Sequence, residues 1–280
     1  MLKTIHTAKD LKEWVLAAKQ AGQTIGLVPT MGFLHEGHLS LVERAKTEND
    51  KIVMSIFVNP AQFGPNEDFD RYPRDLEHDQ QLAENAGVDV IFAPTVEEMY
   101  PKQSDISFAI GAMSKKLCGA QRPGHFDGVL KVVTKLFHLI QADRAYFGQK
   151  DAQQLAIIES LVEDYNFPIA ICRVETVREA DGLAKSSRNV YLSEAERQQA
   201  PHLQKALQLG KQMVLKGEGP IAMMTEYLTD NTTGKIDYID LLAYPSLSEE
   251  VENEAILALA VQFEGARLID NLIFNTKENN

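Results

Sequence analysis

Two short apolar runs, separated by a stretch of helix length, constrain this chain more than any other feature. The runs cover residues 24–29 and 51–59, and each has the length and composition of a strand that is buried on both faces. The stretch between them holds about two dozen residues, which is enough for the right-handed crossover that joins parallel strands. The sequence therefore predicts a parallel sheet that begins with these two strands.

The alternation of strand and helix continues to residue 175. Apolar runs predict further strands at residues 88–92, 145–147 and 169–175. Capping residues and helical spacing of apolar residues predict helices at 7–21, 37–49, 74–86, 131–141 and 152–165. This alternation is typical of an α/β fold.

The pattern changes after residue 177. A long polar helix is expected at residues 193–216, followed by strands at 236–245 and 254–271. A Glu-Gly pair inside the last run predicts a hairpin turn. Because these strands have no helices between them, we expect two domains: an α/β domain over residues 1–176 and a smaller α+β domain over residues 177–280.

Composition limits the possible functions. The 280 residues carry a formal net charge of −12, which argues against nucleic-acid binding, because that function requires a basic face. The two cysteines, Cys118 and Cys172, lack metal-binding spacing and are expected to be free thiols. We find no secretory signal and no apolar run that could span a bilayer, so we expect a cytoplasmic protein.

The first candidate site follows the first strand. Residues 31–38 read MGFLHEGH and lead from that strand into a helix. Ligands of open α/β sheets bind at the carboxyl ends of the strands, and a helix N-terminus there favours an anion such as a phosphate. His35 and His38 lie three residues apart, on one helical face, so both can point at the same anion. We interpret this segment as a nucleotide site.

Other interpretations of the histidines stay open at this point. They could be ordinary surface residues, or a metal-binding pair, although no third ligand is obvious nearby. A dinucleotide-binding loop requires the pattern GxGxxG, which is missing here. The order of strand, loop, two histidines and helix is more specific than a lone HxxH pair, and it favours a nucleotide.

Two later segments could also contact phosphates. Residues 148–154 (GQKDAQQ) follow a short strand, and Lys150 offers a positive charge there, although Asp151 could serve only as a helix cap. Residues 181–189 (DGLAKSSRN) combine a glycine turn with two hydroxyls and Arg188. That pattern suits a phosphate clamp, but it also suits a polar loop between domains.

Polar side chains after the second strand could bind a small substrate. Asn59 and Gln62 lie where the ligand edge of the sheet is expected, but they could equally cap a loop. Arg122 and His125 could be cations of a cleft or ordinary surface residues. Asp79 could hold Mg²⁺ beside phosphates, although a solvated position on its helix is the plainer interpretation.

Six motifs, in this order, resemble the pantothenate synthetase (pantoate–β-alanine ligase) family. They are PTMGFLHEGH (29–38), SIFVNPAQF (55–63), YPR (72–74), RPGHFDGV (122–129), YFGQKDAQQ (146–154) and DGLAKSSRN (181–189). The HxGH pattern alone occurs across the wider nucleotidylyltransferase superfamily, whereas the ordered set is specific to this family.

The resemblance implies a two-step ligase. ATP and pantoate would give pantoyl adenylate and pyrophosphate, and β-alanine would then displace AMP to give pantothenate. The resemblance also implies Mg²⁺, a Rossmann-like N-terminal domain, a smaller C-terminal domain that acts as a lid, and a homodimer.

The resemblance assigns roles to individual residues. His35, His38 and Lys150 correspond to catalytic positions, with His38 as the usual proton donor. Gln62 and Gln154 correspond to the glutamines that hold pantoate, with Gln62 also near β-alanine. Less firmly matched, pocket-lining positions are Asn59, Tyr72, Arg122 and His125. The positions that correspond to ATP contacts are Met31, Gly32, Phe33, Leu34, His35, Glu36, Gly37, His38, Gly148, Gln149, Lys150, Asp151, Val177, Lys185, Ser186, Ser187 and Arg188.

Two departures from the family pattern concern these assignments. Lys185 stands where many relatives carry an apolar residue, and we expect its backbone to make the ATP contact. Asp79 corresponds to a possible magnesium contact, but the neighbouring His78 replaces a carboxylate of some relatives, which weakens that assignment.

Three other functions compete with the ligase. A nucleotidylyltransferase would use the same histidines but keep the nucleotide on its product, and the glutamines Gln62 and Gln154 favour the ligase. A nucleotide-binding scaffold would have no need of histidines, lysine, serine and arginine together. A metal-sensing HxxH protein would retain metal on purification.

Overall fold

The computed structural model describes residues 2–65 and 67–277, which form two compact units. The first unit consists of the described residues up to Gly111, with Arg122–Gln149 and Ile157–Glu175. The second consists of Ala112–Gln121, Lys150–Ala156 and the described residues from Thr176 onward. The second unit thus includes two short segments that precede residue 176, and the division into domains at that residue stays a prediction.

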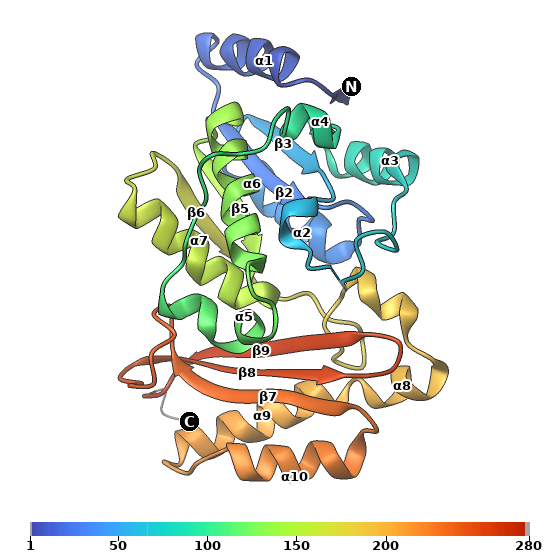
Figure 1. The fold of residues 1–280 in the computed structure, drawn as a ribbon, viewed down its shortest axis with the longest axis vertical. Helices are drawn as coiled ribbons and strands as arrows, with labels where there is room; N and C mark the ends of the chain where they lie inside the picture. The colour runs from blue at the N-terminus through green and yellow to red at the C-terminus, as the bar shows by residue number, and fades with distance from the viewer. Residues whose placement is uncertain (1, 66, 278–280) are drawn as a thin grey trace. The chain divides into compact units, whose positions relative to one another are not determined.

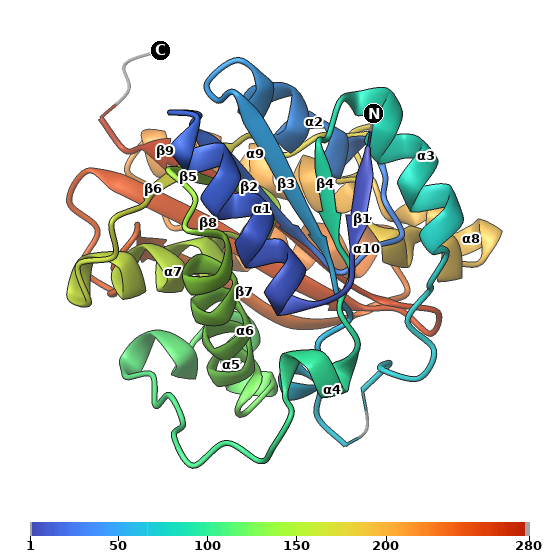
Figure 2. The ribbon, with the colours of Figure 1, turned by 90° about the horizontal axis from the view of Figure 1, so that it is seen from above.

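A six-stranded parallel sheet forms the centre of the first unit, and Figure 2 shows β1, β4, β3 and β2 side by side. The strands are β1 (Lys3–Ile5), β2 (Ile25–Thr30), β3 (Lys51–Ile56), β4 (Val90–Phe92), β5 (Arg144–Gly148) and β6 (Ala170–Val174), in the order β1-β4-β3-β2-β5-β6. All neighbouring pairs run parallel, which confirms the expected α/β class.

The strand order reverses beside β2. The chain runs from β2 outward to β3 and β4, and it returns to β5 on the opposite side of β2 (Figure 1). Open α/β sheets bind their ligands at such a switch point, outside the carboxyl ends of the strands. The loops that follow β2 and β5 are therefore the expected ligand loops of this sheet.

Helices connect the parallel strands. They are α1 (Ala8–Gln20), α2 (Glu36–Lys46), α3 (Leu76–Ala86), α4 (Val96–Met99), α6 (His125–Ile140) and α7 (Ala152–Asp164), with short 3₁₀ helices η1 (Pro60–Gln62) and η3 (Gln149–Asp151). The α2 side chains Leu41 and Val42 belong to a buried cluster with Val28 and Met54 of the sheet. This packing fixes the helix that begins at the two histidines.

The sequence predictions hold for most of this unit. Thr7 is the N-cap of α1, and its hydroxyl accepts from Asp10 N at 3.1 Å, as its position in the sequence suggested. The second predicted strand ends earlier, at Ile56, and α6 begins six residues before the expected start, at His125. Strand β1 was not predicted.

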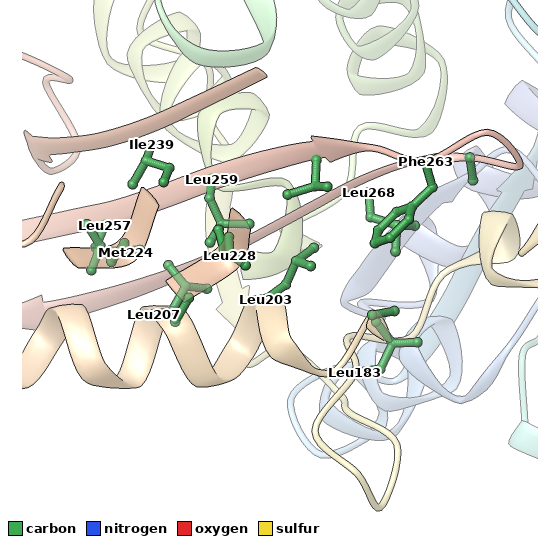
Figure 3. Packing of buried hydrophobic residues seen from close by; sticks show 14 of the residues in the cluster. Leu183, Leu203, Leu207, Met224, Leu228, Ile239, Leu257, Leu259, Phe263 and Leu268 are labelled. Carbon is green, nitrogen blue, oxygen red and sulfur yellow. The ribbon is translucent and has the colours of Figure 1, made fainter. Parts of the chain in front are cut away.

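A three-stranded antiparallel sheet and helices make up the second unit. The strands are β7 (Lys235–Ala243), β8 (Glu254–Gln262) and β9 (Arg267–Asn275), and the helices are α5 (Leu117–Gln121), α8 (Glu194–Gln199), α9 (His202–Leu215) and α10 (Ile221–Asn231), with 3₁₀ helices η2 (Ala112–Lys115) and η4 (Ser187–Tyr191). Figure 3 shows Leu203 and Leu207 of α9 packed with Leu257 and Leu259 of β8.

The hairpin prediction is confirmed, because Gln262 pairs with Arg267 across the Glu-Gly turn. The prediction of one long helix over residues 193–216 is wrong. The helix ends at Gln199 and a new one begins at His202, because Pro201 lacks the N–H that an uninterrupted helix would need. Helix α10 was not predicted. Over residues 2–65 and 67–277, no helix has the length and apolarity to cross a membrane.

Candidate active site

Residues 31–38, here called the histidine loop, lead from the carboxyl end of β2 into the first turn of α2. Gly32 and Phe33 both have left-handed backbones, with φ of 89° and 52°. This conformation costs a residue with a side chain about 1–2 kcal/mol. A β-carbon at Gly32 would also lie 2.8 Å from Asp79 Oδ2 and 2.9 Å from Ile56 Cγ2. Backbone conformation and close packing therefore both require glycine at position 32.

Backbone donors of the histidine loop are engaged within the protein. Phe33 N donates to Asp79 Oδ2 at 2.8 Å, and Leu34 N donates to Asp79 Oδ1 at 2.7 Å. Gly32 N donates to Thr30 Oγ1 at 3.2 Å. A nucleotide contact by these three residues would have to use other atoms, and it stays a prediction.

The two histidines cap the helix that they introduce. His35 is the N-cap of α2, and its Nδ1 accepts from Gly37 N at 3.1 Å. The Nδ1 of His38 accepts from His35 N at 3.3 Å. A neutral imidazole that accepts at Nδ1 carries its proton at Nε2, so each ring offers an Nε2–H donor. With ring centroids 4.0 Å apart, two such donors suit the stabilisation of an anion.

Asp79 lies on α3 with a relative exposure of 1%. Burial raises the pKa of its carboxyl group above the ordinary value, and the hydrogen bonds from Leu34 and Phe33 offset part of that effect. Both oxygens already accept backbone N–H groups and the residue is closed to solvent, and its role as a magnesium contact stays a prediction. Among the residues that the structure describes, no group of three His, Cys, Asp or Glu side chains could hold a metal ion.

A hydrogen-bonded chain fixes Gln62, the predicted substrate ligand of this unit. Asn59 Nδ2 donates to Gln62 Oε1 and to Gly128 O, both at 3.0 Å. Tyr100, for which no role was predicted, donates from its hydroxyl to Asn59 Oδ1 at 2.7 Å. Gln62 Nε2 lies 3.3 Å from Met31 Sδ, so the amide of Gln62 adjoins the histidine loop.

The backbone of Gln62 is held as well. His125 donates from Nδ1 to Gln62 O at 2.7 Å, and its Nε2 then accepts from Arg122 Nη1 at 2.9 Å. Arg122 Nε donates to Glu67 Oε1 at 2.7 Å. Burial raises the pKa of Glu67, but the hydrogen bond and charge of the Arg122 guanidinium lower it by more, so the pKa lies below its ordinary value. Arg122 and His125 thus support Gln62 in addition to any direct ligand contact.

The second ligand loop begins at Gly148, the last residue of β5. The 3₁₀ helix η3 follows, in which Lys150 Nζ lies 3.7 Å from Asp151 Oδ2. Asn271 Nδ2 donates to Lys150 O at 2.9 Å and so restrains the lysine backbone. The ion pair is long, which leaves Lys150 a positive charge that a phosphate could use.

Adjacent glutamines on α7 have different environments. Gln153 is buried, and its Nε2 donates to Met113 O at 2.8 Å and to Lys116 O at 2.7 Å. Its amide therefore holds the backbone of the neighbouring segment. Gln154 is only partly buried, and its role as a substrate ligand stays a prediction.

Residues 178–189, here called the arginine-held segment, are fixed by two guanidinium groups. Arg178 Nη1 donates to Gly182 O at 3.1 Å and to Asp270 Oδ2 at 2.6 Å, and its Nη2 donates to Asp270 Oδ1 at 2.9 Å. Arg197 donates to Asp181 at 2.6 Å and to Glu179 at 2.7 Å.

The candidate phosphate clamp lies within and beside this segment. Lys185 N donates to Val177 O at 2.9 Å, so the backbone of Lys185 is fixed by a residue that was also predicted to contact ATP. Ser186 is the N-cap of η4 and accepts from Arg188 N at 3.2 Å, while Ser187 is buried. A role of Ser186 as a cap is thus evident, and its role toward ATP stays a prediction.

The predicted site residues divide between the two units. The histidine loop and Gln62 belong to the first, whereas Lys150, Gln154 and residues 185–188 belong to the second. Within the first unit, the structure brings Met31 and Gln62 into contact. Cys118, expected to be a free thiol, is free and buried, with its Sγ 3.3 Å from the Tyr238 hydroxyl.

Comparison with known proteins gives a consistent result. A family model described as pantoate-beta-alanine ligase matches residues 3–273. A pantothenate synthetase of Lysinibacillus sphaericus is 56% identical over 282 residues, which cover 99% of each chain.

Solved structures of similar proteins share the fold. A pantothenate synthetase from Thermus thermophilus has a TM-score of 0.90 and 45% identity, covering 96% of this chain and 98% of that one. A pantoate-beta-alanine ligase from Francisella tularensis, complexed with beta-gamma ATP and β-alanine, has a TM-score of 0.82 and 33% identity, covering 100% of this chain and 99% of that one.

Proposed function

Because the chain belongs to the pantoate-β-alanine ligase family, we propose that it uses ATP to join pantoate and β-alanine into pantothenate. One observation supports this proposal most directly. Two histidines that offer Nε2–H donors stand at the switch point of a parallel sheet, and the amide of Gln62 adjoins their loop. An anion site beside an amide suits a nucleotide phosphate next to a small polar acid.

In the first step, a carboxylate oxygen of pantoate attacks the α-phosphorus of ATP. The bond from that phosphorus to the pyrophosphate oxygen breaks, and pyrophosphate leaves with the electron pair. Negative charge increases on the phosphate oxygens in the transition state, and the Nε2–H groups of His35 and His38 donate hydrogen bonds to them.

In the second step, the amine of β-alanine attacks the acyl carbon of pantoyl adenylate. AMP leaves with the electron pair of the C–O bond, and the nitrogen loses a proton. The adenylate already has a good leaving group, so no nucleophilic side chain is required. The remaining contribution of the protein is to hold the two reactants in place, which can lower the barrier by about 7–11 kcal/mol.

The other assigned residues bind the substrates. Lys150 and Lys185–Arg188 contact the phosphates of ATP, and Gln62 and Gln154 hold pantoate. Mg²⁺ accompanies ATP through the phosphate oxygens, which are the ligands that this ion prefers. We also propose that the enzyme is a cytoplasmic homodimer whose C-terminal part acts as a lid.

The test is to measure AMP and pyrophosphate formation from ATP and Mg²⁺, with pantoate and β-alanine added singly or together. We expect AMP only when both are present, together with one pantothenate for each AMP. Transfer of the nucleotide to a product that keeps it, without AMP release on addition of an amine, would indicate a nucleotidylyltransferase instead. Light scattering of the purified protein tests the dimer.

A further inference from the structure

One buried carboxylate holds the segment that leads to both histidines. Asp79 accepts from Phe33 N at 2.8 Å on one oxygen and from Leu34 N at 2.7 Å on the other. Hydrogen bonds of N–H groups to an ionised carboxylate are stronger than those between neutral groups. Asp79 is 1% exposed, so water does not compete for these contacts.

The loop that Asp79 holds is conformationally unfavourable. Gly32 and Phe33 are consecutive left-handed residues, and this turn directs the N–H groups of Phe33 and Leu34 to the same anion. The β-carbon position of Gly32 lies 2.8 Å from Asp79 Oδ2, so the loop wraps closely around the carboxylate. Without the anion, the N–H groups of Phe33 and Leu34 would lose their acceptors, and the left-handed turn would keep only the bond from Gly32 N to Thr30 Oγ1 and the packing of Leu34.

The histidines follow directly on the anchored residues. Leu34 precedes His35, the N-cap of α2, whose own N–H is bound by His38 Nδ1. The Leu34 side chain is buried in the core cluster of the sheet. The positions of both imidazoles are thus set by the end of β2, the packing of Leu34 and the two bonds to Asp79.

We propose that Asp79 is a positioning residue that holds the histidine loop in its active conformation, and not a magnesium ligand. The catalytic part of this proposal rests on the proposed ligase function. The structural part, that Asp79 protects the amides of Phe33 and Leu34, does not depend on the reaction. The two parts can therefore be tested separately.

The first experiment is amide hydrogen exchange of the ligand-free protein. In Asp79→Asn, one carboxylate oxygen becomes an NH₂ group, which cannot accept an N–H. We expect exchange at Phe33 and Leu34 to accelerate about tenfold or more, with β3 unaffected. The matched control is Asp75→Asn on the same helix, which removes the same charge but keeps an oxygen that can accept His78 N and leaves the loop contacts intact. Unchanged exchange at residues 33 and 34 in Asp79→Asn would overturn the proposal.

The second experiment measures kinetics as a function of Mg²⁺ concentration. We expect Asp79→Asn to lower kcat while the Mg²⁺ concentration for half-maximal rate stays at the wild-type value. A raised Mg²⁺ requirement with unchanged exchange would show a metal ligand and contradict us. If Asp79→Asn does not fold, Asp79→Glu moves the carboxylate by one methylene and must show the same faster exchange and lower kcat. If the wild type makes no pantothenate, the ligase proposal fails while the exchange result still decides the anchoring role.

Discussion

The histidine loop and the arginine-held segment are both polar connections fixed by charged groups, but the charge has opposite sign in the two. Asp79, a buried carboxylate of α3, accepts hydrogen bonds from two backbone N–H groups of the histidine loop. The arginine-held segment is fixed by cations instead. Arg178 donates to Gly182 O and to Asp270, and Arg197 donates to two partly exposed carboxylates of the segment. The histidine loop depends on one buried carboxylate, and no second group can replace its contacts. The arginine-held segment is stabilised by several contacts, some buried and some exposed.

The largest change in stability is expected at the buried ion pair of the arginine-held segment, between Arg178 and Asp270. Asp270 is 3% exposed and accepts both terminal nitrogens of Arg178, so Asp270→Asn leaves a guanidinium without its counter-charge. We expect a loss of about 3 kcal/mol in the free energy of unfolding, the lower end of the usual range because Arg178 keeps some contact with solvent. Urea denaturation measures this. A loss as small as that of an exposed ion pair would mean that the segment does not depend on Arg178.

The histidine loop should instead show its largest effect on rate. We expect His38→Ala to lower kcat about 10²–10³-fold, because a donor to the developing negative charge is lost. The free energy of unfolding should fall by at most about 1 kcal/mol, the value of one capping contact. Steady-state kinetics and urea denaturation of the same preparation give both numbers. Activity within threefold of wild type, a limit near 0.7 kcal/mol, would remove His38 from the mechanism.

Glycine replacements compare the constraint on the two ligand loops of the sheet. Gly32→Ala places a β-carbon 2.8 Å from Asp79 Oδ2 on a left-handed backbone, so we expect a loss of about 1–3 kcal/mol in stability. Gly148→Ala is the matched control, because its β-carbon would meet no atom within 4 Å. Thermal unfolding of the two variants measures the difference. Equal midpoints would mean that the loop moves away from Asp79 easily.

The smallest effect is expected at the exposed contacts of the arginine-held segment, which Arg197 makes with Glu179 and Asp181. The side chains of Arg197, Glu179 and Asp181 are 32%, 31% and 42% exposed, so salt screens their contacts. We expect Arg197→Ala to lose about 0.2–1 kcal/mol at low salt, and less at high salt. Urea denaturation at two salt concentrations tests this. A loss that does not change with salt would indicate that packing of the arginine stem dominates.

Local chemistry explains which features the sequence predicted. Thr7, Asp10 and the Glu-Gly turn act through neighbours in the chain, so their roles in a helix start and a hairpin could be inferred. Strand β1 has three residues and is defined by its pairing with β4, far along the chain, so no local pattern marks it. Pro201 is a local signal for the break between α8 and α9, but the polar pattern that continues across it concealed the break.

The candidate site shows the same limit. The strand, loop and helix order around His35 and His38 predicted their place at the sheet edge. The acceptor of Leu34 N, however, is Asp79, which lies 45 residues further along the chain. No local pattern around Asp79 indicates that its carboxylate contacts the turn of the histidine loop. Tyr100 was missed for the same reason, because its partner Asn59 lies 41 residues away.

The histidine cap of α2 has a consequence for how this chain can vary. Helices start most stably at Asn, Asp, Ser or Thr, and an imidazole is a weaker choice. Asp at position 35 would therefore favour the helix start while placing a negative charge where an anionic ligand is expected. Helix stability thus favours Asp at position 35, whereas binding of an anionic ligand favours His. Mutations that make the protein more robust must be sought elsewhere in the molecule, since the first turn of α2 cannot be improved without loss of its chemistry.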